Sequence, residues 1–239
     1  MQIHVLKNAE KCGQACVALV IAQLLKKPDA ILGLPTGSTP IPTYQTLIEA
    51  YKQGLVDFSH ASSFNLDEYV GLEKTHPCSY YSFMHEQLFD HVNFKSSHLP
   101  NGNAANLAEE GANYDAAIAK AGGIDLQILG VGVNGHIGFN EPDSCFTYAC
   151  HPLALTQSTI DANKGYFSSE AEMPKKAITL GIGGIMNAKQ IVLVATGKSK
   201  AEAIQAAVHG DITPQWPISI LRSHPNVIFL LDEAAAALL

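Results

Sequence analysis

Short, continuously apolar runs alternate along the chain with longer stretches in which apolar residues recur at helical spacing. The apolar runs predict six strands, at residues 30–34, 62–66, 124–129, 177–180, 191–195 and 227–231. Apolar runs without alternation are typical of strands buried on both faces, which occur in parallel sheets covered by helices.

The stretches between these runs predict helices. One has a capping residue, three are followed by a glycine, and one is predicted from its apolar spacing alone. The predicted segments are 8–26 with Asn8 as the cap, 41–51 ending at Gly54, 80–88, 104–121 ending at Gly122, and 198–208 ending at Gly210. Strand–helix alternation of this kind favours an α/β fold with a doubly wound, mostly parallel sheet and helices on both faces. With no repeat or low-complexity linker, we expect residues 1–239 to form one modified Rossmann-like domain.

In doubly wound folds, ligands bind at the carboxyl ends of the strands, so the loops there are the candidate sites. The first such loop follows the predicted strand 30–34 and leads into a helix; its polar members are Thr36, Gly37, Ser38 and Thr39. Hydroxyl groups and the free N–H groups of the helix N-terminus could hold a phosphate there. An ordinary capped turn is the alternative, and the spacing of a P-loop is absent.

The second loop carries two adjacent carboxylates, Asp67 and Glu68, at the end of a predicted buried strand. Adjacent side chains on a strand point to opposite faces, so we expect the two to have different roles. A carboxylate in a partly dry pocket can serve as a general base. The alternative is a carboxylate that caps the following turn.

The third loop contains the spacing Gly130-x-Gly132-x-x-Gly135, which by letter matches a dinucleotide-binding fingerprint. We expect no dinucleotide here, because that fingerprint must open a helix and Pro142 would break one. His136 and Glu141 are the chemically capable residues of this loop. A carboxylate that accepts from one imidazole nitrogen fixes the tautomer, which leaves the other nitrogen free to move a proton.

The composition of the chain excludes some classes of protein function. Apolar residues make up 47% of the chain and the net charge is −7, which excludes a disordered chain and argues against nucleic-acid binding. Five cysteines, an odd number, favour a reducing cytoplasm, and neither a signal peptide nor a membrane span is predicted. The histidines do not have metal-ligand spacing, and no Gly-x-Ser-x-Gly elbow is present.

Together the loops 32–40, 64–72 and 135–142 resemble the glucosamine-6-phosphate deaminase (glucosamine-6-phosphate isomerase) family, and segments 79–84, 99–102 and 206–210 fit as well. The resemblance implies conversion of glucosamine 6-phosphate and water to fructose 6-phosphate and ammonium in amino-sugar (N-acetylglucosamine) catabolism, with no cofactor and no metal. It further implies that His136, oriented by Glu141, opens the sugar ring and that Asp67 moves the proton from C2 to C1. Phosphate would be held by residues 36–39 and by Lys200.

The chain departs from the family pattern at several positions. Asn134 stands where many members carry Asp, so it is expected to belong to the catalytic group as a hydrogen-bonding residue and not as a proton carrier. Gly165 stands at the position of the family's phosphate-binding arginine, and we expect Lys164 to replace it in part. His151 and Leu153 occupy positions where hexameric members have basic residues for an activator, so a monomer or small homo-oligomer without an allosteric N-acetylglucosamine 6-phosphate site is expected.

Two other functions remain open from the sequence. The resemblance extends in fold to 6-phosphogluconolactonases, but those lack the Phe-Asn-Glu-Pro that follows His136 here. A non-catalytic sugar-phosphate sensor domain would usually follow a DNA-binding helix-turn-helix, whereas this sequence begins directly with the α/β pattern. Release of ammonium would distinguish the deaminase from both.

Overall fold

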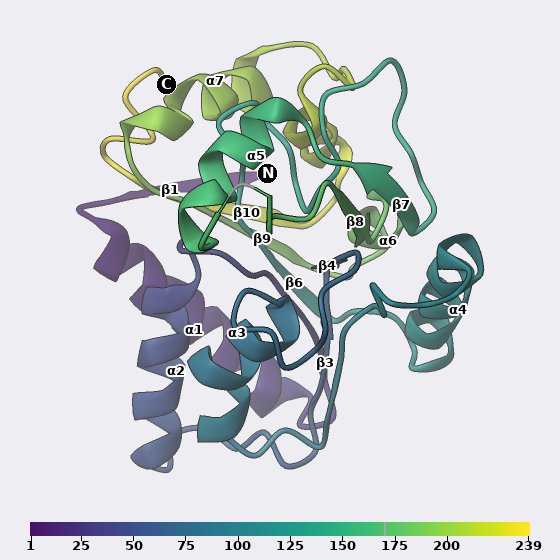
Figure 1. The fold of residues 1–239 in the computed structure, drawn as a ribbon. Coiled ribbons are helices and arrows are strands. Elements are labelled where there is room, and N and C mark those ends of the chain that lie inside the picture. Colours follow the sequence, from purple (N-terminus) through teal and green to yellow (C-terminus); the bar gives the residue numbers. More distant parts are fainter. Residues whose placement is uncertain (170) are drawn as a thin grey trace.

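The centre of the computed structural model, which describes residues 1–169 and 171–239, is a seven-stranded parallel sheet (Figure 1). Its strands, in spatial order, are β1 (Gln2–Leu6), β10 (Val227–Asp232), β9 (Ile191–Ala195), β6 (Leu126–Leu129), β2 (Ile31–Leu34), β3 (Ser62–Asn65) and β5 (Ser96–His98). All neighbouring strands in this sheet run parallel. The predicted parallel sheet is therefore confirmed.

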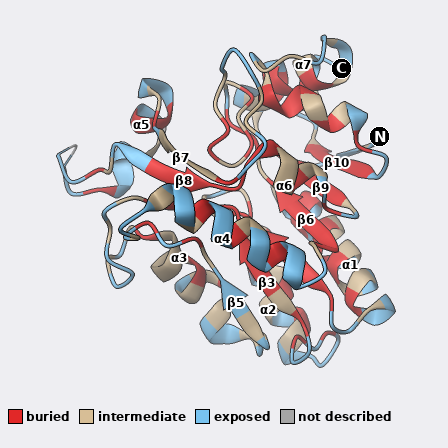
Figure 2. Ribbon diagram, turned by 90° about the vertical axis from the view of Figure 1, so that its right-hand side faces the viewer, coloured by how far each residue is buried: buried red, intermediate tan, exposed pale blue. Residues whose placement is uncertain are grey.

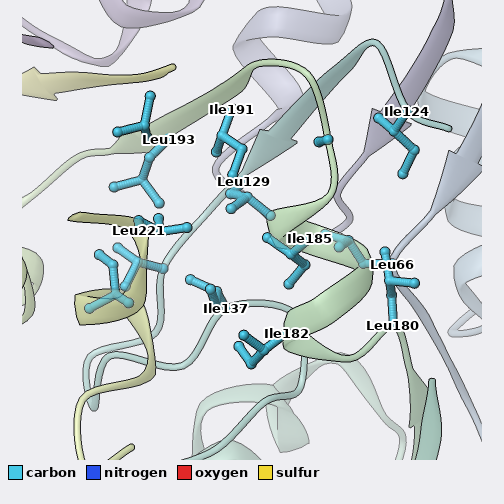
Figure 3. Packing of buried hydrophobic residues seen from close by; sticks show 14 of the residues in the cluster. Leu66, Ile124, Leu129, Ile137, Leu180, Ile182, Ile185, Ile191, Leu193 and Leu221 are labelled. Carbon is cyan, nitrogen blue, oxygen red and sulfur yellow. The ribbon is translucent and has the colours of Figure 1, made fainter. Parts of the chain in front are cut away.

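Helices cover both faces of this sheet. One face carries α1 (Ala9–Lys26), α2 (Ile41–Lys52) and α3 (Tyr80–Gln87), and the other carries α4 (Leu107–Lys120), α6 (Ile182–Met186) and α7 (Ala201–His209), with the 3₁₀ helix η4 (Pro217–Ser223). Alternate side chains of β9 supply the two cores: Val192 packs with the first group, whereas Ile191 and Leu193 pack with the second (Figure 3). Because each central strand is covered on both sides, it is buried along its length (Figure 2).

A second, three-stranded sheet is antiparallel and consists of β4 (Asp67–Tyr69), β8 (Lys176–Thr179) and β7 (His151–Ala154). The sequence assigned residues 177–180 to the parallel sheet, and that assignment is wrong. Ile178 packs into the core of the main sheet, whereas Ala177 packs into a small separate cluster with Tyr69 and Phe139. The strand is thus buried on both faces without being parallel, which is why its apolar run misled the prediction.

The predicted helices are present with small changes at their ends. Asn8 caps α1 by accepting from the backbone N–H of Lys11, at 3.0 Å. The predicted helix 104–121 begins at Leu107, because Asn106 is its N-cap, and the predicted helix 198–208 begins as a 3₁₀ turn, η3 (Lys198–Lys200). The strands β1, β4, β5 and β7 and the helices α5 (Gln157–Asn163) and α6 had no predicted counterpart; the short 3₁₀ helices η1 (Phe89–His91) and η2 (Lys164–Tyr166) complete the described elements.

The strand order creates a switch point between β2 and β6. From β2 the chain proceeds to β3 and β5 on one side, whereas β6 lies on the other side of β2, next to β9. Connections that leave neighbouring strands in opposite directions open a crevice at the carboxyl ends of those strands. The loops that follow β2, β3, β6 and β9 therefore meet at one edge of the sheet. None of the described helices is long and apolar enough to span a bilayer.

We expect Gly102→Ala to destabilise the fold next to β4. A Cβ at this position would lie 2.0 Å from the carbonyl oxygen of Tyr69, a backbone atom that cannot move without displacing the strand. The free energy of unfolding in urea should fall by about 1–3 kcal/mol, as for other overpacked sites. Gly165→Ala is the control, since no atom lies within 4 Å of a Cβ added there. Equal effects of the two substitutions would contradict the packing of β4 described here.

Candidate active site

A cavity of about 240 Å³ opens at the switch point and collects side chains from seven segments of the chain. These are the loop after β2 (Thr36–Thr39), the start of β4 (Asp67), helix α3 (Tyr80), the glycine-rich loop after β6 (His136), helix α5 (Ser158, Thr159 and Asn163) and the turns η2 (Tyr166) and η3 (Lys200). The structure thus brings three separately predicted loops to one cavity.

Asp67 is the buried carboxylate that faces this cavity. It lies where the chain passes from β3 into β4, it is only 5% exposed, and no described residue donates a hydrogen bond to its side chain. Burial, with a smaller contribution from the neighbouring charge of Glu68, raises its pKa to about 8. An unpartnered carboxylate with a pKa near neutrality can exchange protons with a bound ligand.

Glu68 is equally buried but has a different role. Its carboxylate accepts from the backbone N–H groups of Tyr69, Tyr80 and Tyr81 at 2.8–2.9 Å, and so holds the N-terminus of α3. Burial raises its pKa, and the three donors only partly offset this. The expectation that adjacent carboxylates have different roles is confirmed: Glu68 caps a helix, and Asp67 faces the cavity.

Glu141 lies behind His136 and is held by donors on both of its oxygens. Oε2 accepts from Nδ2 of Asn134 at 2.7 Å, and Oε1 accepts from the hydroxyl of Thr159. Nδ1 of His136 lies 3.4 Å from Oε2, a close electrostatic contact that is longer than a good hydrogen bond. Burial alone would raise the pKa of Glu141, but these three neighbours outweigh it and lower the pKa to about 2. Glu141 is therefore an ionised acceptor beside the imidazole.

Two glycines of the third loop leave room for the His136 ring and for the Asp67 carboxylate. A Cβ at Gly132 would lie 2.3 Å from the His136 ring, and Gly138 has φ +58° with its virtual Cβ 3.5 Å from Oδ2 of Asp67. No helix follows Gly135 before Pro142, so the segment lacks the context of a dinucleotide fingerprint.

The loop Thr36–Thr39 connects β2 to the N-terminus of α2, with Gly37 at φ +89°. Lys200 enters the cavity from η3, and burial lowers the pKa of its ammonium group. The base of that turn is fixed because both carboxylate oxygens of Asp232 accept from the N–H of Gly197 at 3.0 Å. The loop Thr36–Thr39 and Lys200 therefore bring hydroxyls, backbone N–H groups and an ammonium to the cavity, a combination suited to an anion.

The structure does not bring Lys164 to the cavity. Its ammonium group pairs with Asp161 at 2.8 Å, and both side chains are about half exposed. The sole arginine, Arg222, donates to the carbonyl of Val208 at 3.3 Å, between η4 and α7. The partial replacement of an arginine by Lys164 stays a prediction.

Sequence reasoning missed several residues that line the cavity. Tyr80 was assigned to a packing stripe, yet its ring stacks on Phe139 and faces the cavity near Asp67. Ser158, Thr159 and Asn163 come from α5, whose short and largely polar sequence gives no periodic signal. Within residues 1–169 and 171–239, no three His, Cys, Asp or Glu side chains are arranged to hold a metal ion.

Comparison with known proteins gives a family match over most of the chain. The family model for glucosamine-6-phosphate isomerases/6-phosphogluconolactonase matches residues 7–229. A glucosamine-6-phosphate deaminase of Thermoanaerobacter pseudethanolicus is 49% identical, covering 100% of this chain and 95% of the relative. One of Clostridioides difficile is 48% identical, covering 99% and 96%.

Solved structures agree with the sequence relatives. A monomeric glucosamine-6-phosphate deaminase superimposes with a TM-score of 0.96 at 39% identity, over 100% of both chains. A 6-phosphogluconolactonase from Leishmania guyanensis gives a TM-score of 0.78 at 20% identity, over 98% of this chain and 97% of that one. The second likeness shows a common fold only.

The raised pKa of Asp67 predicts a pH-dependent effect of Asp67→Asn on stability. Between the ordinary pKa of an aspartate and about 8, the folded protein keeps a proton that the unfolded chain releases. The unfolding free energy of the wild type should therefore fall as pH rises through this range, and that of the variant should not show this decline. The difference in unfolding free energy, variant minus wild type, should rise by at least about 1 kcal/mol from pH 5 to pH 9 when both are unfolded in urea. Parallel pH profiles would show that Asp67 titrates normally.

Proposed function

Because the chain belongs to the glucosamine-6-phosphate isomerase and 6-phosphogluconolactonase family, we propose that it is a glucosamine-6-phosphate deaminase. The reaction converts glucosamine 6-phosphate and water to fructose 6-phosphate and ammonium. The observation that carries the proposal is the pairing, around one cavity, of a protonatable Asp67 with a His136 backed by an ionised Glu141. Names of full-length relatives at 48–49% identity support the same substrate.

Ring opening is assigned to His136. Nδ1 faces Glu141, which leaves Nε2 as the nitrogen that exchanges protons with the ligand. It would take the proton of the anomeric hydroxyl and deliver one to the ring oxygen, so that the C1–O5 bond breaks and an aldehyde forms. Glu141 acts through the imidazole, because its negative charge stabilises the cationic ring that exists between the two transfers. Asn134 contributes by holding Oε2 of Glu141.

Asp67 would carry out the isomerisation. Its ionised carboxylate takes the proton from C2 of the open chain, and the resulting acid returns the proton to C1. As C1 gains this hydrogen, the aldehyde oxygen takes up a proton to become the C1 hydroxyl, the nitrogen gives one up, and the C2 amine becomes an imine. Water then adds to the imine carbon, and the C–N bond breaks so that the nitrogen leaves, protonated, as ammonium and the ketose remains. Burial suits this shuttle, because an acid with a pKa of about 8 keeps the C2 proton until C1 accepts it, while a fraction of Asp67 is still ionised near neutral pH and can begin the reaction.

The phosphate end would lie against Thr36–Thr39 and Lys200. These groups contact a part of the substrate that does not react, so their binding energy is common to the ground state and the transition state. We propose that Lys164 adds at most a weak contact, because Asp161 already pairs with it.

We place the reaction in cytoplasmic amino-sugar catabolism and expect a monomer or small homo-oligomer; the close structural neighbour is described as monomeric. We expect no activation by N-acetylglucosamine 6-phosphate. His151 and Leu153 line a separate cavity of about 370 Å³, to which the described residues bring neither lysine nor arginine. A phosphate activator would find no permanent cation there.

The test of the proposed function is release of ammonium and fructose 6-phosphate from glucosamine 6-phosphate by purified protein, with a chelator present. Asp67→Asn should lower kcat by about 10²- to 10⁴-fold, because an amide cannot take the C2 proton. Binding of the sugar phosphate should persist in this variant. Hydrolysis of a 6-phosphogluconolactone without any ammonium from the amino sugar would replace the proposal with a lactonase.

Lys200→Ala should raise KM for glucosamine 6-phosphate about tenfold or more while kcat stays within a few-fold, since a charge-assisted contact to the phosphate is lost. Lys198→Ala is the matched control, because this lysine lies in the same turn but is exposed. The phosphate site proposed here is wrong if both substitutions change KM by the same factor.

A further inference from the structure

We propose that Thr159 is a positioning residue that fixes the plane of the Glu141 carboxylate for the proton transfers made by His136. The proposal rests on the proposed function, because it concerns the ring-opening step of that reaction. It assigns a role to α5, a helix that the sequence did not predict.

The hydroxyl of Thr159 has a defined direction of hydrogen bonding. Its side chain is 1% exposed, and its oxygen accepts from the hydroxyl of Thr156 at 3.3 Å. Its single proton is donated to Oε1 of Glu141. An ionised carboxylate can only accept, so the proton of Thr159 must point toward Glu141.

One donor alone would not fix Glu141. Asn134 donates to Oε2, but it lies in the same loop after β6 as Glu141. With this hydrogen bond alone, the carboxylate could still rotate about the line from Asn134 to Oε2. Thr159 holds the other oxygen from a different element of the fold. Two donors from separate elements define a plane, and that plane sets how Oε2 faces Nδ1 of His136, at 3.4 Å.

The same helix also forms part of the cavity. Ser158 and Asn163 line it beside Thr159. The turn after the helix is tied to the rest of the site, because the thiol of Cys78 donates to the carbonyl of Tyr166 at 3.1 Å and the ring of Phe167 lies 5.7 Å from that of Tyr69, edge to face. Thr159 therefore connects a helix that lines the cavity to the carboxylate behind the imidazole.

The first experiment compares Thr159→Ala with Thr159→Ser. Loss of a hydrogen bond to a charged group should lower kcat on the closed-ring sugar by ~10- to 100-fold with little change in KM. An open-chain analogue, which bypasses ring opening, should be spared. Thr159→Ser keeps the hydroxyl and should retain most of kcat. The control is Thr46→Ala, which removes a helical hydroxyl that bonds only within α2, to the carbonyl of Pro42.

The second experiment does not depend on turnover. Carboxyl ¹³C NMR, with Glu141→Gln to assign the signal, should show the pKa of Glu141 rising from about 2 in Thr159→Ala and staying low in Thr159→Ser. His136 is the titratable group that faces this carboxylate, and its imidazole signals are followed in the same titration.

The outcomes separate the two proposals. A wild type that releases no ammonium from glucosamine 6-phosphate overturns the proposed function, while the NMR titration still decides whether Thr159 holds Glu141. A Thr159→Ser variant as slow as Thr159→Ala shows that the methyl group and not the hydroxyl matters, which overturns the role proposed for Thr159. An unchanged pKa of Glu141 in Thr159→Ala overturns it as well.

Discussion

The active site depends on the burial of two adjacent carboxylates at the point where β3 passes into β4. Taking both charges out of water would be prohibitive if neither had a partner. The fold gives all the donors to Glu68, which accepts three backbone N–H groups of β4 and α3. Asp67 receives none from the described residues, so it can keep its proton near neutral pH. Anchoring Glu68 therefore fixes the strand that presents Asp67 to the cavity.

A third carboxylate in the same region, Glu141, differs from Asp67 in its pKa. Glu141 and Asp67 are both removed from solvent, yet the pKa of the first is about 2 and that of the second about 8. The difference comes from donors: Asn134, Thr159 and the nearby His136 stabilise the charged form of Glu141. With pKa values this far apart, Glu141 stays ionised near neutral pH, whereas Asp67 can take up or release a proton.

The three loops could be located from the sequence because parallel topology places the carboxyl ends of adjacent strands at one edge. Asp67, His136 and Lys200 each follow a strand whose apolar run was visible, so their convergence was predictable. The position of Thr159 was not, because its helix is short and largely polar, and its contact with Glu141 joins residues 18 positions apart in the sequence. The assignment of 177–180 to the parallel sheet was wrong for a related reason: burial on both faces does not report strand direction.

The phosphate site that we propose would contain no arginine. An exposed lysine such as Lys164 is screened by solvent and already neutralised by Asp161, so it can add little. Lys200 is different, because burial makes its charged form costly, and its pKa is lowered accordingly. A phosphate that enters would relieve that cost and would be screened less by salt than at an exposed lysine. In this proposal, backbone N–H groups after Gly37 would supply the directional contacts that a single ammonium lacks.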